Sequence, residues 1–343
     1  MNKKKKNVLI AGIAGASLGT EILKCLILSD NYDIFGCDIS DLAYGQYQFG
    51  FNETFLVDRD NYIRDIMELC IERKIQYIIP GGEEPMILIG RNRKSFENEG
   101  ISYIGNSEKV IEVCSSKAKT FKILSSLGFK VPFTKSISIL SDLDDMIFPC
   151  IIKPSAGSGG SVTVFLAENQ EEAGLYVNYL LRNGKPVIAQ DYIPHEEGEF
   201  TVGVLSSKNQ EIFGSIALKR IFSSKLSVLF KSEIGLISTG YSQGLIDSFP
   251  DVTEISERIA KSISSEGPIN IQGRIRDGTF IPFEINPRFS ASTYLRALAG
   301  FNEVDIYLKY LINGRSLDPI EIKPGYYLRS FTEKYVRKEE LKK

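Results

Sequence analysis

Four polar side chains near the end of the chain could together hold a divalent cation and a phosphate. Glu284 and Asn286 lie two residues apart in a predicted strand, so they share one face of it. Gln272, in the preceding strand, supplies a third oxygen ligand, and such oxygens suit hard cations such as Mg²⁺ that also hold phosphate oxygens. Arg288 follows where a planar cation can face developing negative charge. These residues alone leave open an ordinary hairpin with solvated polar side chains on its outer face.

The turn between the two strands decides whether Gln272 can join Glu284. Asp277-Gly278 alone suggests a two-residue turn, which would place Gln272 opposite Phe283 and on the face away from Glu284. Shared coordination requires the other register, because a slip of one residue moves every side chain to the opposite face. We therefore predict an odd-numbered loop, most simply about three residues long with Gly278 in the left-handed conformation.

A glycine-rich loop in the middle of the chain could bind phosphate. Lys153 ends a predicted strand and shares a face with Ile151, because side chains alternate along a strand. The loop that follows contains Gly157, Ser158, Gly159 and Gly160. Its N–H groups could bind anions, although no Gly-Lys-Ser/Thr follows and the loop is therefore not a Walker A loop. Taken alone, a loop of this kind is more often a simple surface turn.

A second glycine pattern lies at the start of the chain. Gly12, Gly15 and Gly19 follow the first predicted strand, and Asp38 ends the second, where a ribose ligand would lie. The spacing departs from the dinucleotide fingerprint. We therefore favour the interpretation that these glycines let a helix begin close against a strand, while an anion site at the helix N-terminus stays open.

Composition limits the class of protein. The chain has 343 residues, with 41 Lys and Arg against 43 Asp and Glu, and a formal net charge of −2. This balance argues against a broad basic surface for nucleic acid. His195 is the single histidine, which excludes a His-rich metal centre or a His relay. Carboxylates, lysines, arginines and amides must therefore carry any catalysis.

The cysteines and the N-terminus suggest where the protein works. Five cysteines are scattered without a C-x-x-C pair, which is typical of small buried side chains in a reducing compartment. The lysine-rich start leads only to a short apolar run, Val8 to Ala14, which is too short for a membrane span. We expect a cytoplasmic protein without a membrane partner.

Strand and helix signals divide the chain. Up to about residue 112 they alternate with short turns, which predicts a parallel sheet covered on both faces. Within this part, residues 62–74 have helical periodicity. Beyond it we predict a strand over 146–153, a helix from about 170 to 181 and, from Glu199 onward, strands of the antiparallel kind.

Four segments carry a resemblance to a known family. They are Ser116-Lys117 through Pro132, Pro149 to Pro154 with the glycine loop, Gln190 to Ile193 with Glu199 to Val202, and Phe283 to Arg288. In order and spacing they resemble the ATP-grasp family, especially its carbamoyl-phosphate-synthase-like members, over nearly the entire chain. The resemblance implies an α/β and α+β fold. A Rossmann-like domain over 1–112 would precede an ATP-grasp domain made of two α+β subdomains, over 113–185 and 186–335, with a charged tail over 336–343.

The resemblance also implies residues that bind ATP. The phosphates would contact Lys117 and Lys153, with Gly157, Ser158, Gly159 and Gly160 folding over them. Gln190, and the backbone of Asp191 and Ile193, would hold adenine. Glu199 would accept hydrogen bonds from the ribose hydroxyls.

The metal and catalytic residues follow from the same resemblance. Gln272 and Glu284 would bind one Mg²⁺ ion, and Glu284 and Asn286 a second, with Mn²⁺ as an alternative metal. Gln272 is an amide where many family members carry a carboxylate. Arg288 would stabilise the phosphorylated intermediate and would act with Lys153 in catalysis.

The resemblance implies an ADP-forming ligase that joins a small carboxylate to an amine through an acylphosphate. One alternative is a bicarbonate-activating enzyme that makes carboxyphosphate or carbamoyl phosphate, and another is an ATP-binding regulatory module without turnover. Candidate substrate residues are Glu84, Arg220 and Arg296, although for each arginine a structural ion pair is equally open. Neither substrate can be named, and a homodimer stays open.

Overall fold

The computed structural model describes residues 5–15, 17–156, 163–223, 225–314 and 320–342. Its first unit contains a five-stranded parallel sheet in the order β3-β2-β1-β4-β5. The strands are β1 (Lys6–Ala11), β2 (Tyr32–Asp38), β3 (Glu53–Leu56), β4 (Tyr77–Pro80) and β5 (Ser102–Tyr103). The helices are α1 (Leu18–Ser29), α2 (Tyr62–Glu72), α3 (Glu83–Arg91) and α4 (Arg93–Asn98). The helix predicted over 62–74 is therefore present.

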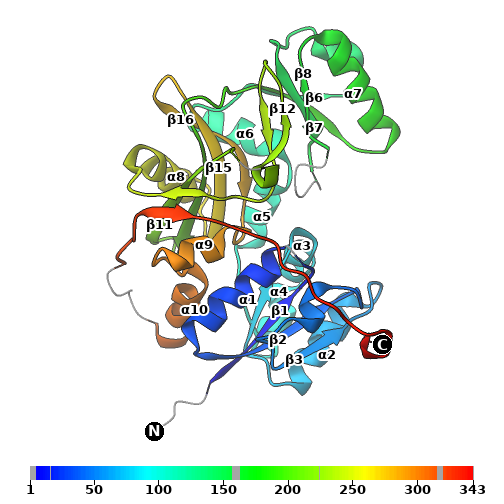
Figure 1. Ribbon diagram of the computed structural model, residues 1–343, viewed down its shortest axis with the longest axis vertical. Coiled ribbons are helices and arrows are strands. Elements are labelled where there is room, and N and C mark those ends of the chain that lie inside the picture. The colour runs from blue at the N-terminus through cyan, green and yellow to red at the C-terminus, as the bar shows by residue number, and fades with distance from the viewer. Residues whose placement is uncertain (1–4, 16, 157–162, 224, 315–319, 343) are drawn as a thin grey trace.

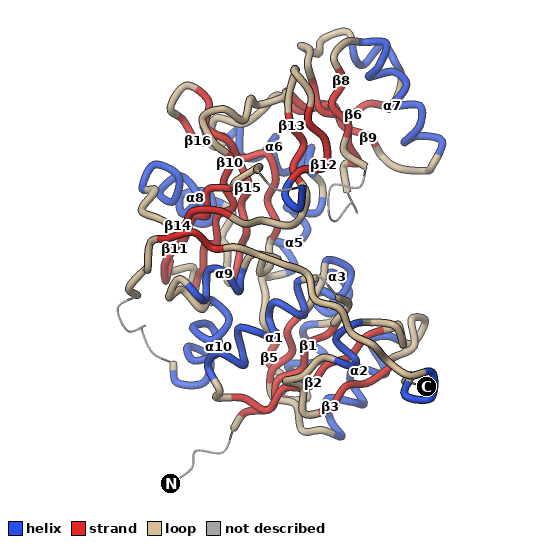
Figure 2. Tube along the Cα trace, in the orientation of Figure 1, coloured by secondary structure: helices blue, strands red, loops and turns tan. Residues whose placement is uncertain are grey.

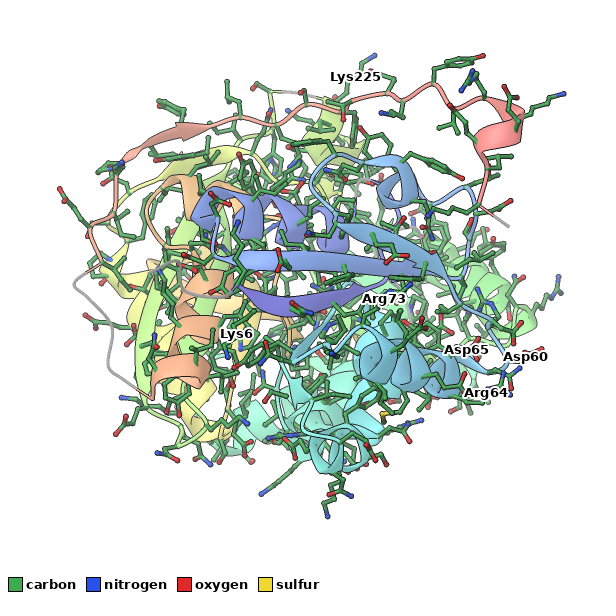
Figure 3. All side chains as sticks on the ribbon, turned by 90° about the horizontal axis from the view of Figure 1, so that it is seen from below. Lys6, Asp60, Arg64, Asp65, Arg73 and Lys225 are labelled. Carbon is green, nitrogen blue, oxygen red and sulfur yellow. The ribbon has the colours of Figure 1, made fainter. Side chains whose placement is uncertain are left out.

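Helices cover both faces of this parallel sheet, as the alternating pattern predicted. Successive side chains of β1 point to opposite faces. Val8 and Ile10 pack with α1 in one core cluster, whereas Leu9 and Ala11 pack with α2 in another. Seen from below, the strands lie between α1 and α2, and Arg64 of α2 lies on the outer side (Figure 3).

The second sheet has four antiparallel strands in the order β6-β9-β7-β8. They are β6 (Thr134–Ile137), β7 (Cys150–Pro154), β8 (Phe165–Ala167) and β9 (Val187–Asp191). Helix α7 (Gln170–Arg182) packs Ala173, Val177 and Leu180 against this sheet. The predicted helix is confirmed, but β7 begins four residues later than the predicted strand, at Cys150.

The third sheet has six antiparallel strands in the order β16-β15-β10-β11-β14-β17. They are β10 (Glu199–Ser206), β11 (Ile212–Arg220), β14 (Gly244–Ile246), β15 (Pro268–Arg276), β16 (Thr279–Asn286) and β17 (Gly325–Tyr327). A separate pair, β12 (Val228–Lys231) and β13 (Leu236–Ser238), lies beside the second sheet (Figure 2), where Ile237 packs with Leu166 and Tyr192.

Five helices belong to the third sheet or to its approach, namely α5 (Glu108–Ser115), α6 (Lys117–Ser126), α8 (Pro250–Ser262), α9 (Thr293–Leu298) and α10 (Glu303–Asn313). Helices α5, α6 and α8 share a core cluster with one face of the sheet. Helices α9 and α10 pack on the other face together with α1 of the first unit. Figure 1 shows this contact between the blue helix α1 and the orange helices.

Hydrogen bonds reinforce this contact between the first unit and the rest of the chain. The Tyr32 hydroxyl donates to Asp305 at 2.8 Å, and the Asn302 side chain donates to the Cys25 carbonyl at 2.9 Å. At the other end of the chain, the Lys342 ammonium donates to the Thr54 carbonyl at 2.9 Å. Within the ranges described above, no helix is long and apolar enough to cross a membrane.

The hairpin between β15 and β16 differs from the prediction. Asp277 and Gly278 form a two-residue turn, with Arg276 paired to Thr279 and φ positive at both turn residues. The three-residue loop is therefore wrong. A β-bulge between Gln272 and Gly273 shifts the register, and beyond it Gln272 pairs directly with Glu284.

Candidate active site

One pocket gathers seven of the predicted residues from five elements. Lys117 comes from α6, Lys153 from β7, and Gln190 and Asp191 from β9 with Ile193 just beyond it. Gln272 from β15 and Glu284 from β16 complete the set. Apolar side chains also line the pocket, among them Ile151, Val164, Leu236, Ile237 and Phe283. An apolar wall beside lysines and a carboxylate suits a ligand with a flat apolar part and an anionic part.

Lys153 is buried and held at two points. Its ammonium donates to the Gln190 side-chain oxygen at 2.7 Å and to the Phe283 carbonyl at 3.3 Å. Burial, reinforced by the charge of Lys117, lowers the pKa of Lys153 to about 7, although Glu284 acts in the opposite direction. An anionic partner would stabilise the charged form of this lysine. Ile151 and Lys153 line the same pocket, which confirms that they share a strand face.

The Gln190 side chain is engaged on both sides. Its oxygen accepts from Lys153, and its nitrogen donates to the Thr134 hydroxyl at 2.9 Å. In this arrangement the amide orients the Lys153 ammonium. Its expected contact with adenine stays a prediction.

The start of α6 is tied to the end of β7. Ser116 caps the helix by accepting from the Lys119 amide, and the Lys117 amide donates to the Ser155 carbonyl at 3.0 Å. These contacts bring the Lys117 side chain to the pocket next to Lys153, two positions that lie far apart in sequence.

Gln272, Glu284 and Asn286 place three side-chain oxygens on one hairpin. Gln272 and Glu284 face each other across the strands, and the Asn286 amide donates to Glu284 at 3.3 Å. Within the described part of the chain, no cluster of three His, Cys, Asp or Glu side chains could hold a metal ion. A cation here would therefore depend on amide oxygens and on one carboxylate.

Arg274 is a pocket residue to which our sequence analysis gave no role. Its guanidinium donates to Glu199, to the Ile193 carbonyl at 2.6 Å and to the Leu236 carbonyl at 2.8 Å. It also lies 5.2 Å from the centroid of the Tyr192 ring. Arg274 stands two positions after Gln272, so its place on the same strand was the available signal.

Glu199 lies between two guanidinium groups. Its side chain is fully buried and does not line the pocket, and its two oxygens accept from Arg220 at 3.0 Å and from Arg274 at 2.8 Å. Burial alone would raise the pKa of Glu199, but the two guanidinium groups lower it below its usual value. The carboxylate therefore supports Arg274 beneath the pocket in this structure, and its expected contact with ribose stays a prediction.

Arg220 and Arg296 both lie in buried ion pairs. Besides Glu199, Arg220 contacts the Ser238 hydroxyl and the carbonyls of Thr239 and Tyr241. Arg296 is fully buried and paired with Glu303 at 3.2 Å. These contacts favour the ion-pair alternative for both arginines, and a contact of either one with a substrate carboxylate stays a prediction.

Arg288 and Glu84 lie outside the pocket. Arg288 is partly buried and donates to the Phe289 carbonyl at 2.9 Å. Burial lowers its pKa, whereas the nearby charges of Glu284 and Glu83 raise it, so the first turn of α3 approaches this end of the hairpin. Glu84 lines a different cavity. The expected phosphate contacts of Gly157, Ser158, Gly159 and Gly160 fall outside the described residues.

The comparison with protein families agrees with this geometry. A family model of the ATP-grasp domain matches residues 114–292, which is more than half of the chain. The chain belongs to the ATP-grasp family. The matched region contains all seven predicted residues that line the pocket.

Relatives and solved structures extend this result. An uncharacterised protein of Methanocaldococcus jannaschii is 27% identical over 73% of this chain and 57% of its own length. The carbamoyl phosphate synthase large chain of Saccharolobus islandicus is 24% identical over 74% of this chain, which spans only 24% of the synthase. This ATP-grasp chain therefore spans about half or less of the length of these relatives.

The similarity in structure is broader. An L-amino acid ligase from Bacillus licheniformis aligns with a TM-score of 0.66 and 16% identity, over 94% of this chain and 78% of the ligase. The biotin carboxylase domain dimer of 2-oxoglutarate carboxylase from Hydrogenobacter thermophilus, in complex with MgADP and bicarbonate, aligns with a TM-score of 0.65 and 18% identity. This match covers 95% of this chain and 74% of that chain. At such identities the matches support the ATP-grasp fold.

Proposed function

We propose that this protein is an ATP-dependent ligase that joins a small carboxylate to an amine and releases ADP and phosphate. One observation carries the proposal: a single pocket combines Lys117 and Lys153 with the facing pair Gln272 and Glu284. Phosphoryl transfer depends mainly on positioning and on neutralising charge. It needs no histidine base, which suits a chain whose one histidine lies outside this pocket.

The proposed reaction has two steps. A carboxylate oxygen attacks the γ-phosphorus, the bond to the β–γ bridging oxygen breaks, and ADP leaves. The amine then attacks the acyl carbon, the bond to phosphate breaks, and the nitrogen loses a proton as the amide forms. In the first step Lys117 and Lys153 would hold the phosphates, and Arg288 would face the charge that develops on the transferred group.

The ligand set is consistent with magnesium bound together with nucleotide. Gln272 and Glu284 would hold one ion, and Glu284 and Asn286 a second, with Mn²⁺ as a substitute. Mg²⁺ commonly takes one or two protein carboxylates and completes its coordination with phosphates and water. With one carboxylate among the three proposed ligands, we infer weak metal binding without nucleotide. The bound metal would neutralise phosphate charge during transfer.

The proposal also covers the domains, the cellular location and the assembly of the protein. We infer a Rossmann-like domain over 1–112, ATP-grasp subdomains over 113–185 and 186–335, and a charged tail over 336–343. The strand order β3-β2-β1-β4-β5 supports the first of these. All five cysteines are buried and unpaired, which supports a reducing, cytoplasmic location. A homodimer is the assembly we would test first.

An ADP-release screen over carboxylates crossed with amines tests the function. We expect ADP release only when both substrates are present, and one ¹⁸O from a labelled carboxylate should appear in the released phosphate. ADP release with bicarbonate alone would favour carboxyphosphate chemistry. Stoichiometric ATP binding with no ADP release under any mixture would favour a regulatory module. Label absent from phosphate, or present in AMP, would contradict the acylphosphate route.

A further inference from the structure

A second cavity, of about 260 Å³, lies at the carboxyl ends of the parallel strands. Gly12 follows β1, Asp38 ends β2, and Gly81 and Gly82 follow β4. In open α/β sheets this edge is where ligands commonly bind. A water molecule occupies about 30 Å³ in the liquid, so the cavity has room for a small organic molecule. Helix α3, which borders it, lies on the side of the first unit toward the other sheets (Figure 1).

Tyr62, at the start of α2, supplies an unsatisfied polar group in this cavity. Its side chain is 8% exposed and lines the cavity, and its hydroxyl has no hydrogen-bond partner among the described residues. Burial, reinforced by Cys37, Asp38 and Glu84, raises the pKa of Tyr62 well above its usual value, so the phenol stays neutral. A buried hydroxyl without a partner costs free energy. A ligand with a polar group would satisfy it.

The glycines at this edge serve packing rather than phosphate binding. Gly12 has a φ of +97°, and a Cβ at Gly19 or Gly81 would lie 1.9 Å from the Gly12 carbonyl oxygen. The Gly19 amide donates to the Gly81 carbonyl at 3.1 Å. These contacts explain the glycine pattern through the close approach of two loops. They favour our original interpretation over a dinucleotide site.

The charge at the cavity is acidic on balance. Asp38 accepts from the Ile13 amide at 2.7 Å and from the Ser40 amide at 3.1 Å, which leaves acceptor capacity on its carboxylate. Glu84 and Arg59 form an exposed pair at the rim, 3.6 Å apart. Two carboxylates therefore face one guanidinium.

Apolar side chains form the remaining wall. Ile39 follows β2, and Pro85 and Leu88 belong to α3. The exposed surface of the lining is mostly apolar. The cavity thus combines an apolar wall with a few acceptor groups, which suits a ligand that carries a cationic donor on a hydrocarbon body.

We propose that this cavity binds a primary amine with an aliphatic body, its ammonium held by Asp38, Glu84 and the Tyr62 oxygen. The assignment of this amine as the nucleophile of the ligation rests on the proposed function. The start of α3 supports that assignment, because it contributes Glu84 to the cavity and Glu83 to the field around Arg288.

Calorimetry without ATP tests the site with two homologous series, alkylamines from methylamine to hexylamine and the carboxylates from acetate to hexanoate. We expect only the amines to bind at pH 7.5, with affinity rising about fourfold for each CH₂ until the wall is covered. Tyr62→Phe and Glu84→Gln should each weaken hexylamine binding about tenfold. Both should fold normally, since one removes an unpaired hydroxyl and the other changes an exposed side chain.

Tyr103→Phe is the matched control. Tyr103 also has a buried hydroxyl without a partner among the described residues, but it does not line the cavity, so amine binding should be unchanged. The proposal is overturned if no amine binds, if the carboxylates bind equally well, or if Tyr62→Phe and Glu84→Gln leave binding intact. Adenosine binding without amine binding would instead indicate a nucleoside site. Because the assay contains no ATP, failure of ligase activity would leave a positive result for the cavity standing.

Discussion

Gln272 and Glu284 face each other only because the hairpin changes register between its turn and its far end. Next to the turn Arg276 pairs with Thr279, a register that would place Gln272 opposite Phe283. The bulge takes Phe283 out of the pairing, and its carbonyl accepts from Lys153 at 3.3 Å. One extra residue therefore aligns the side chains of Gln272 and Glu284 and also holds the buried lysine.

This pairing predicts the effect of restoring a carboxylate at position 272. In Gln272→Glu, two carboxylates would face each other across the strands and bind a divalent cation more tightly. We expect the Mg²⁺ concentration for half-maximal ADP release to fall about tenfold, because ligand charge strongly tunes the affinity for hard cations. Gln272→Leu should raise this Mg²⁺ concentration. A magnesium titration at saturating ATP measures it for both variants.

The control for this prediction adds the same charge at the other end of the hairpin. Thr279→Glu places a carboxylate beside Arg276, next to the turn and away from Glu284. It should leave the magnesium requirement unchanged. An equal shift in Thr279→Glu and Gln272→Glu would show that net charge, and not coordination, is responsible.

Glu284→Ala should separate catalysis from nucleotide binding. Loss of the only carboxylate among the three proposed ligands would leave phosphate charge poorly neutralised, and losses of this kind commonly cost about 2.7–4 kcal/mol of barrier, or roughly 10²–10³ in rate. ATP affinity should fall less, because the apolar wall around Ile237 and Leu236 remains. Single-turnover ADP release and nucleotide titration measure the two effects. If the rate of ADP release and the affinity for ATP fall by the same factor, Glu284 contributes to ground-state binding alone.

The lowered pKa of Lys153 predicts that nucleotide binding takes up a proton. With a pKa of about 7, most Lys153 side chains are neutral amines at pH 8. Anionic phosphates would raise this pKa on binding. ATP affinity should therefore fall as pH rises above 7. In the protein without nucleotide, Lys117 and Arg274 lower the pKa of Lys153, whereas Glu284 raises it. Calorimetry at pH 8 in buffers with different ionisation heats should detect the uptake in the wild type.

Lys153→Met supplies the control, since it should abolish the proton uptake. An uptake that persists in Lys153→Met would assign it to another group.

The lowered pKa of Lys153 also affects the stability of the protein without nucleotide. Between pH 7 and 10.5 the unfolded chain binds more protons at this lysine than the folded chain, so the contribution of Lys153 to unfolding free energy should rise with pH across that window.

Local rules held at this site even where our prediction, a three-residue loop in the hairpin, set one of them aside. Ile151 and Lys153 share a strand face because strand side chains alternate, and Asp277-Gly278 forms the two-residue turn that its residue types favour. The bulge at Gln272 was not predictable in this way. It depends on how β16 pairs with a strand whose other edge is held by β10.

Burial was the second limit of prediction. Glu199 begins a strand and has the type expected of a ribose ligand, but its environment is set by Arg220 and Arg274, which lie 21 and 75 residues away. Whether a charged side chain faces a pocket or an ion pair depends on such distant partners. The same reason applies to Arg296 and Glu303, which meet inside the core.

The role of Glu199 gives the last prediction, in which stability and nucleotide binding are expected to respond differently. Glu199→Ala would leave Arg220 and Arg274 buried without their carboxylate, and breaking a buried pair in this way typically costs about 3–5 kcal/mol of unfolding free energy. Urea unfolding at pH 7 measures this loss. A ribose contact would instead leave stability nearly normal and raise the KM for ATP.

The matched control for Glu199→Ala is Glu197→Ala. Glu197 is exposed and accepts from the Asp277 and Gly278 amides at 2.9 and 3.0 Å, so its loss should cost only about 1 kcal/mol.

The wild type should also show the pH signature of a carboxylate with a lowered pKa. The stability that Glu199 contributes is present above its usual pKa of 4.5 and is lost as pH falls through the lower folded value. A Glu199→Ala protein as stable as Glu197→Ala, with weakened ATP binding, would return Glu199 to the nucleotide site.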